Sequence, residues 1–318
     1  MSTESGLGSS QTLRHNRVES LLEALERVVP VPAEHRTWIS EDAAIDCLRC
    51  DRSELLAARD AGLATRAEDY ERYDVLNLAL AEGKQHTQIE REMVFFGRLL
   101  RSHGRDWTSP FDYQIVAEAR CPREADCQDG QWLIAPSIPG VRWMSKESGS
   151  GYAVWEGSIT LEGRCEPILS PLIARVWDEF LVSYRYQFTP YSLANDVVRT
   201  RERKVGDCFA LSRVLADELN VARGNAVVVP GYIYGGSRAR RHMWVEVLDD
   251  DGAMKSLDPS MALLAESYFT EEFRGHCFGS RLNRIIRLES EADFNVNHIC
   301  SEGAVRTHAA LRLKPVRV

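Results

Sequence analysis

Three residues that lie far apart in the chain carry side chains that together can transfer an acyl group. Cys208, His242 and Asp258 occur in that order, each where an expected helix or strand begins or ends. In such a set the thiol attacks a carbonyl carbon, the imidazole moves the proton and the carboxylate orients the imidazole. Taken singly, each is more commonly a buried thiol, a hydrogen-bonded imidazole or a turn carboxylate. Their joint spacing favours a catalytic triad.

A helix is expected to hold Cys208. Residues 208–219 are good helix formers, with Leu211, Leu215 and Leu219 on one stripe. Cys208 then lies in the first turn, where the partial positive charge of the helix N-terminus favours thiolate over thiol. This placement predicts that Cys208 is the nucleophile.

A β-hairpin is expected to hold the other two residues. Residues 242–248 alternate between two faces, a turn of acidic residues and glycine follows, and residues 253–257 return. If Leu248 pairs with Gly252, so that paired positions sum to 500, Asp258 lies directly opposite His242. Side chains opposed in this way have Cβ atoms about 4.5–5.5 Å apart. We therefore predict that His242 and Asp258 are neighbours on adjacent antiparallel strands.

Three segments resemble the core of the transglutaminase-like superfamily, which shares the papain-like cysteine-protease fold. They are Gly206-Asp207-Cys208, His242-x-Trp244-Val245-Glu246-Val247 and Leu257-Asp258-Pro259-Ser260. The resemblance covers residues 172–264, and the residues before them match no family that we can name. It implies an α+β fold in which an antiparallel sheet packs on the nucleophile helix, preceded in this chain by a small helical domain.

The resemblance also implies a mechanism. Cys208 would attack an amide or thioester carbonyl to give an acyl-enzyme, with His242 as base and then acid and Asp258 holding the imidazole. The backbone N–H of Cys208 would be one oxyanion donor. Three residues are candidates for the second donor, and Trp244 is a further candidate to line the cleft; the three are Tyr186, Gln187 and Tyr191.

The superfamily contains protein cross-linkers, peptidases, amidases and the amide-forming acyl transferases of antibiotic pathways, so the triad leaves the acceptor open. Our leading interpretation is acyl transfer from a thioester or amide donor to an amine. The first alternative is hydrolysis of an amide through the same acyl-enzyme. The second is a non-catalytic interaction protein in which the helical domain acts.

Two basic clusters flank the proposed nucleophile and base. The first lies in the polar segment 195–204 that leads to Gly206, and the second directly precedes His242. Their members are Arg199, Arg201, Arg203 and Lys204, then Arg238, Arg240 and Arg241. Two solvated loops would explain them, and so would an electropositive rim that steers an acidic partner such as an acyl-carrier protein.

The chain of 318 residues is expected to contain a disordered tail (1–16), a helical domain (17–105) and a catalytic domain (106–318) that opens with a β extension. A net charge of −8 and a pI near 5.6 argue against nucleic acid as the main partner. Without a signal peptide or an apolar run of membrane-spanning length, a cytoplasmic protein is expected. The oligomeric state is left open.

The eight cysteines are dispersed along the chain and are expected to be reduced thiols. Cys47 and Cys50 form a Cys-x-x-Cys pair inside an expected helix, but no second pair has the usual zinc spacing, because Cys121 and Cys127 are six apart. Neither a metal nor a cofactor is therefore expected. Cys277 and Cys300 are expected to be buried thiols.

Overall fold

The computed structural model describes residues 17–83, 88–101, 106–122, 127, 130–133, 135–149, 151–235, 238–300 and 303–316. The expected tail, 1–16, lies outside them. The structure is mixed α+β with several antiparallel sheets, and it divides into two compact units. The first comprises Met1–Phe95 and Ser183–Val214, and the second comprises Phe96–Val182 and Leu215–Val318. This division differs from the expected one, because residues 183–214 group with the N-terminal helices.

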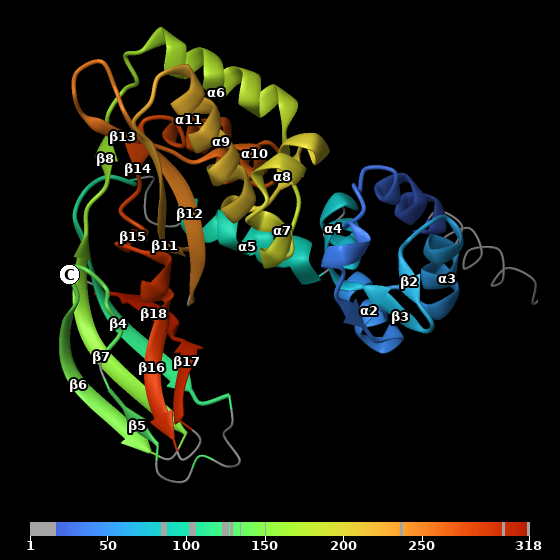
Figure 1. Cartoon of the computed structure of the whole chain (residues 1–318), viewed down its shortest axis with the longest axis horizontal. Helices are drawn as coiled ribbons and strands as arrows, with labels where there is room; N and C mark the ends of the chain where they lie inside the picture. The colour runs from blue at the N-terminus through green and yellow to red at the C-terminus, as the bar shows by residue number, and fades with distance from the viewer. Residues whose placement is uncertain are drawn as a thin grey trace, which may run out of the picture. The chain divides into compact units, whose positions relative to one another are not determined.

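The N-terminal part of the first unit is mainly helical (Figure 1). Its elements are a helix over residues 17–25, η1 (Ala33–His35), β1 (Trp38–Ile39), α2 (Glu41–Leu48), α3 (Arg52–Asp60), β2 (Thr65–Arg66), β3 (Asp69–Glu71), α4 (Arg72–Ala81) and the start of α5 (Gln88–Arg101). Local sequence fixes the starts of these helices. Ser40 caps α2, and Asp51 and Glu54 form a capping box on α3.

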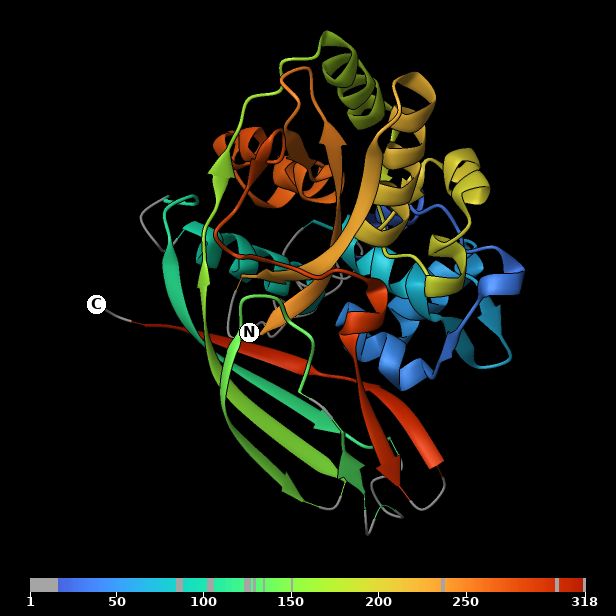
Figure 2. The same ribbon diagram turned by 60° about the vertical axis from the view of Figure 1, so that its left-hand side comes forward.

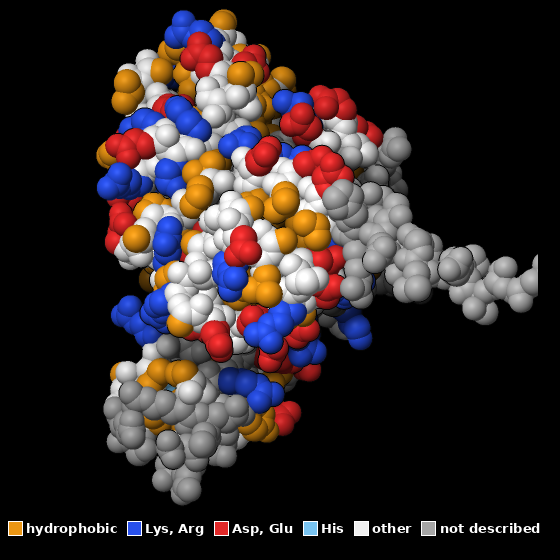
Figure 3. All heavy atoms as spheres, turned by 90° about the vertical axis from the view of Figure 1, so that its right-hand side faces the viewer, with side chains coloured by type: hydrophobic (Ala, Val, Ile, Leu, Met, Phe, Trp, Pro, Cys, Tyr) orange, Lys and Arg blue, Asp and Glu red, His pale blue; other side chains and the backbone are white. Residues whose placement is uncertain are grey.

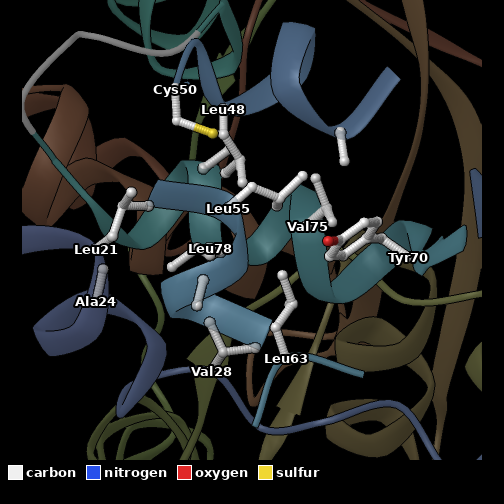
Figure 4. Packing of buried hydrophobic residues seen from close by; sticks show 13 residues of the cluster. Leu21, Ala24, Val28, Leu48, Cys50, Leu55, Leu63, Tyr70, Val75 and Leu78 are labelled. Atoms are coloured by element: carbon white, nitrogen blue, oxygen red, sulfur yellow. The ribbon is translucent and has the colours of Figure 1, made fainter. Parts of the chain in front are cut away.

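Apolar side chains from these helices form one core (Figure 4). Leu21, Leu55 and Leu78 are fully buried in it, and Cys50 lies at its edge. Burial raises the pKa of Cys47 to about 11 and that of Cys50 to about 12. The Cys-x-x-Cys pair is therefore part of a helical core, as two protonated thiols.

The C-terminal part of the first unit is a chain of short elements. They are β9 (Arg185–Tyr186), α7 (Tyr191–Ala194), α8 (Val197–Arg203), β10 (Val205–Gly206) and the start of α9 (Cys208–Ala222). The segment 195–204 was expected to be a polar connection, but it contains α8, which Asp196 caps. Side-chain amides tie these elements to the N-terminal helices: Asn77 exchanges two hydrogen bonds with the backbone of Phe188.

The second unit contains the sheet that carries His242, in the strand order β13-β12-β11-β15. These strands are β11 (Ala226–Tyr234), β12 (Ala239–Leu248), β13 (Met254–Leu257) and β15 (Ile285–Arg287). Figures 1 and 2 show three helices near this sheet, namely α6 (Pro171–Ser183), α10 (Pro259–Tyr268) and α11 (Glu271–His276). Beside them β8 (Arg164–Cys165) pairs with β14 (Ser280–Arg281).

Two further sheets extend away from these helices (Figure 2). One has the order β18-β4-β7-β6 and the other the order β17-β16-β5. Their strands are β4 (Phe111–Arg120), β5 (Gln131–Trp132), β6 (Arg142–Gly149), β7 (Tyr152–Leu161), β16 (Asn295–Cys300), β17 (Gly303–His308) and β18 (Ala310–Pro315), and η2 (Glu291–Phe294) precedes β16. The expected β extension is present, but it is completed by strands from the C-terminus. Within the described residues, no helix has the length and apolar character that crossing a bilayer requires.

Candidate active site

Cys208 is the first residue of α9, at the position where a helix N-terminus acts on it most strongly. The preceding strand β10 runs parallel to β9, with Gly206 paired to Tyr186, so the entry to the helix is held by a small ladder. A side chain at Gly206 would come within 2.7 Å of the Ala210 Cβ. Glycine is therefore required for this close turn into the helix. The thiol of Cys208 is half-buried.

Asp207 caps the helix that Cys208 begins. Its carboxylate accepts the backbone N–H groups of Phe209 and Ala210 at 3.0 and 3.1 Å. Burial raises the pKa of Asp207 to about 6, although these hydrogen bonds act in the opposite direction. The motif Gly206-Asp207-Cys208 contains Asp207, but the sequence did not predict that its carboxylate caps the helix.

His242 and Asp258 form a buried hydrogen bond. The His242 Nε2 and the Asp258 Oδ2 are 2.5 Å apart, and both residues are buried, with exposed fractions of 3% and 7%. The other carboxylate oxygen, Oδ1, accepts the Ser260 hydroxyl and the Met261 backbone N–H, each at 3.0 Å. Asp258 is thus the N-cap of α10 and the partner of the imidazole at once.

The predicted strand register is wrong by two residues, although the predicted contact is present. Val245 pairs with Leu257 and Leu248 pairs with Met254, so paired positions sum to 502, because the turn is longer than the expected three residues. The pairing ends at Leu257, and Asp258 lies just beyond it. A shift of two preserves the face on which each side chain lies. Asp258 therefore still reaches His242, as a diagonal rather than a direct neighbour.

Trp244 lies beside His242 on the same strand, with ring centroids 6.1 Å apart and an interplanar angle of 24°. Its side chain is buried, so this part of β12 is covered rather than open to a cleft as expected. Its ring packs against the backbone of Gly231, which pairs with His242 across the ladder. A side chain at Gly231 would collide with the Ile286 carbonyl and come within 2.7 Å of the indole. Glycine at 231 allows the indole to sit beside the imidazole.

The three candidate oxyanion donors lie near the start of α9 but differ in availability. Gln187 donates its backbone N–H to the Gly206 carbonyl at 3.0 Å, yet its side-chain amide is buried and bonded to the backbone of Arg27 and Val29. Tyr186 packs edge-on against Phe188. Tyr191 is 57% exposed at the start of α7. Gln187 is thus held in a structural role, and the two tyrosines remain the candidates.

The first basic cluster is largely engaged in local contacts. Arg199 pairs with Glu34 and Glu202, and Arg203 donates to the backbone carbonyls of Val29 and Pro30. Lys204 contacts Tyr184 through its hydroxyl and its ring. On the face shown in Figure 3, basic and acidic side chains are interspersed rather than segregated.

The second basic cluster is exposed where β12 begins, with Arg238 directly before the strand and Arg240 and Arg241 within it. Arg238, Arg240 and Arg241 are all solvent-accessible, and Arg241 also contacts His308 at 3.3 Å. These three cations lie at the start of the strand that carries His242. The second cluster is therefore the more accessible of the two.

The proposed catalytic residues are divided between the two compact units. Cys208 belongs to the first unit, and His242 and Asp258 belong to the second. A cavity of about 170 Å³ in the second unit is lined by charged residues that include Arg281, Arg287 and Glu246, and none of the three proposed residues lines it.

Comparison with known proteins adds little to this geometry. No protein-family model and no curated protein matches the chain. One solved structure that resembles it is described as "a Putative Cysteine Protease from Cytophaga hutchinsonii", with 9% sequence identity and a TM-score of 0.37, covering 66% of this chain and 92% of the other. A TM-score of this size does not show a common fold, so the assignment of function rests on the residues themselves.

Proposed function

We propose that this protein is a cysteine-dependent acyl transferase of transglutaminase-like fold, in which Cys208, His242 and Asp258 form the triad. The buried hydrogen bond between His242 and Asp258 carries this proposal. A carboxylate bonded to Nε2 makes the imidazole a stronger base and leaves Nδ1 as the atom that exchanges a proton with the nucleophile. Cys208 is the first residue of α9 and is half-buried, so its thiol is held by the helix and still accessible to a substrate.

In the proposed reaction, the Cys208 sulfur bonds to the carbonyl carbon of a thioester or amide donor. The leaving thiol or amine departs with a proton from the His242 imidazolium, which leaves an acyl-enzyme. An acceptor amine then gives its proton to His242 as its nitrogen bonds to the acyl carbon. The bond to sulfur breaks, and the products are an amide and the regenerated thiol.

Mass spectrometry of the intact protein tests the chemistry. Incubation with thioester donors should add the acyl mass to wild-type protein and not to Cys208→Ala. Release of the adduct by added amine, with formation of the amide, supports transfer; release by water alone supports the hydrolytic alternative. Full biological activity of Cys208→Ala would establish the second alternative, a non-catalytic interaction protein.

The pairing of Cys208 with His242 needs its own test, because the two residues belong to different units. A thiolate held by an imidazolium reacts with iodoacetamide well below the ordinary cysteine pKa of about 8.5. We expect wild-type Cys208 to be alkylated rapidly at pH 6–7, and His242→Ala to return the rate to the profile of a free thiol. Identical profiles for the two proteins would contradict the pairing.

We further propose that the acyl donor is carried by an acidic partner, such as an acyl-carrier protein. The exposed cluster of Arg238, Arg240 and Arg241 at the start of β12 supports this. Electrostatic steering acts on association and weakens with salt. The proposal therefore concerns a carrier-bound donor and not a small thioester.

A further inference from the structure

Four potential metal ligands converge in the second unit, away from the proposed triad. The ligand atoms of Cys121, Cys127, His298 and Cys300 all lie within 4.8 Å of one another, and all four residues are buried. Within this set, the Cys127 Sγ and the His298 Nε2 lie 2.9 Å apart. From this arrangement we propose that the four residues bind one structural Zn²⁺ ion.

The ligand set and its dimensions suit zinc. Three thiolates and one imidazole are a usual tetrahedral set, with Zn–S near 2.3 Å and Zn–N near 2.0–2.1 Å, which places neighbouring ligand atoms about 3.5–3.8 Å apart. The observed separations run from 2.9 Å, between the Cys127 Sγ and the His298 Nε2, to an upper limit of 4.8 Å, so they bracket that spacing. With four protein ligands, no coordination position stays open for a substrate or water. The site is therefore structural rather than catalytic.

The backbone brings the four ligands together from two distant segments. Cys121 directly follows β4, and Cys127 lies between β4 and β5. His298 and Cys300 lie two apart on β16, so they project from the same face of that strand. β5 pairs with β16, with Trp132 opposite His298, which closes the arrangement.

Neighbouring residues pack closely around the four proposed ligands. A side chain at Gly130 would collide with the His298 ring and come within 2.6 Å of the Cys127 sulfur. The Trp132 ring covers the imidazole, with centroids 4.4 Å apart.

A zinc ion would also explain how this small part of the structure is stabilised. Among the residues that the structure describes, the buried apolar cluster here comprises Cys121, Cys127 and Cys300, with Val305 packed against it. Three thiols bury little apolar surface, and β5 is a strand of only two residues. Small elements with so little core are commonly held by a metal or by disulfides, and all the cysteines are free.

Metal analysis of the full chain, purified without chelator, tests the proposal. We expect one zinc per chain, with a several-fold loss of zinc in Cys121→Ser and Cys300→Ser. Cys165→Ser, at an exposed thiol, and Cys277→Ser, at a buried thiol outside the cluster, are the matched controls and should keep the metal. Absence of zinc, its retention in the cluster variants, or iron in its place would overturn the proposal.

A second measurement on unmodified protein covers the case in which a cluster variant fails to fold. After zinc is exchanged for Co²⁺, we expect the intense visible bands of tetrahedral cobalt and a near-ultraviolet sulfur-to-cobalt charge-transfer band. Chelation should lower the melting temperature and expose three additional thiols to a thiol reagent. An octahedral cobalt spectrum, or thiol exposure that chelation does not change, would refute the assignment.

Discussion

Asp258 has two roles, as the hydrogen-bond partner of His242 and as the N-cap of α10, and its replacement by asparagine separates them. Both carboxylate oxygens act as acceptors: Oδ2 from the His242 side, and Oδ1 from Ser260 and Met261. An amide has one acceptor oxygen and one donor nitrogen, so it cannot serve both sides. If the oxygen stays on the Met261 N–H, the amide nitrogen donates to Nε2 of His242. The proton then sits on Nδ1, and the ring cannot accept one from a thiol.

The expected size of the effect follows from the two roles. Loss of a general base costs about 10²–10⁴-fold in rate. If the amide instead turns toward His242, its donor nitrogen meets the Met261 N–H, and the lost N-cap costs about 0.5–2 kcal/mol of unfolding free energy. One orientation of the amide should therefore lower the reaction rate, and the other should lower the unfolding free energy.

The assay combines the rate of acyl-adduct formation on Cys208 with thermal unfolding of the same preparations. Ser260→Ala is the control, because it removes one donor to Oδ1 and leaves the contact with His242 in place. We expect Asp258→Asn to lower the rate at least 100-fold or to unfold clearly earlier, and Ser260→Ala to do neither strongly. If Asp258→Asn is folded as stably as wild type and reacts within about twofold of it, Asp258 does not position the base.

Three further predictions concern the supports of the proposed site. Gly231→Ala should destabilise the protein by about 1–3 kcal/mol through overpacking against Trp244. Gly275→Ala is the control, because nothing lies within 4 Å of a Cβ at that position. Equal melting temperatures for the two variants would refute this prediction. Burial raises the pKa of Asp207 to about 6, so its ionisation opposes folding as pH rises from about 4 through 6. The unfolding free energy of Asp207→Asn should therefore gain up to about 3 kcal/mol relative to wild type between pH 4 and 7, measured by denaturant unfolding. Parallel pH profiles for the two proteins would contradict this. Arg240→Glu should slow acylation from a carrier-bound donor more at low salt than at high salt and leave a small thioester unaffected; equal loss with both donors would count against steering.

Local signals predicted the elements of the site well, because each depends on residues close in sequence. The helix at Cys208 follows from its leucine stripe, and the strand at His242 follows from its alternation. The short helix α8 was missed because its exposed face is a run of charged residues without an apolar stripe. The grouping of residues 183–214 with the N-terminal helices was also missed. It depends on contacts such as Asn77 to Phe188, which join residues 111 apart.

The hairpin shows why a wrong register still led to the right contact. The expected turn was too short, and the observed pairing is shifted by two residues. Parity along a strand is set by the alternation of side chains, so an even shift keeps His242 and Asp258 on one face, while an odd shift would have separated them. What sequence could not supply is the N-cap geometry that turns the Asp258 carboxylate back toward the imidazole.

The cluster of Cys121, Cys127, His298 and Cys300 was not predicted, because its residues come from segments that lie far apart in the sequence. Spacing rules for zinc sites test whether two pairs of ligands each lie within a short segment, and the segment from Cys121 to Cys127 failed that test. Its partners are a His-x-Cys pair, His298 and Cys300, whose spacing of two suits a strand and not a zinc turn. The pairing of β5 with β16, and the hydrogen bond from the Thr307 hydroxyl of β17 to the Arg120 carbonyl of β4, bring the two segments together from positions about half of the chain apart. The sequence does show that His298 and Cys300 are two residues apart, a spacing that puts both side chains on one face of a strand. It does not show which segment pairs with that strand, so this pattern could not be assigned to a metal site.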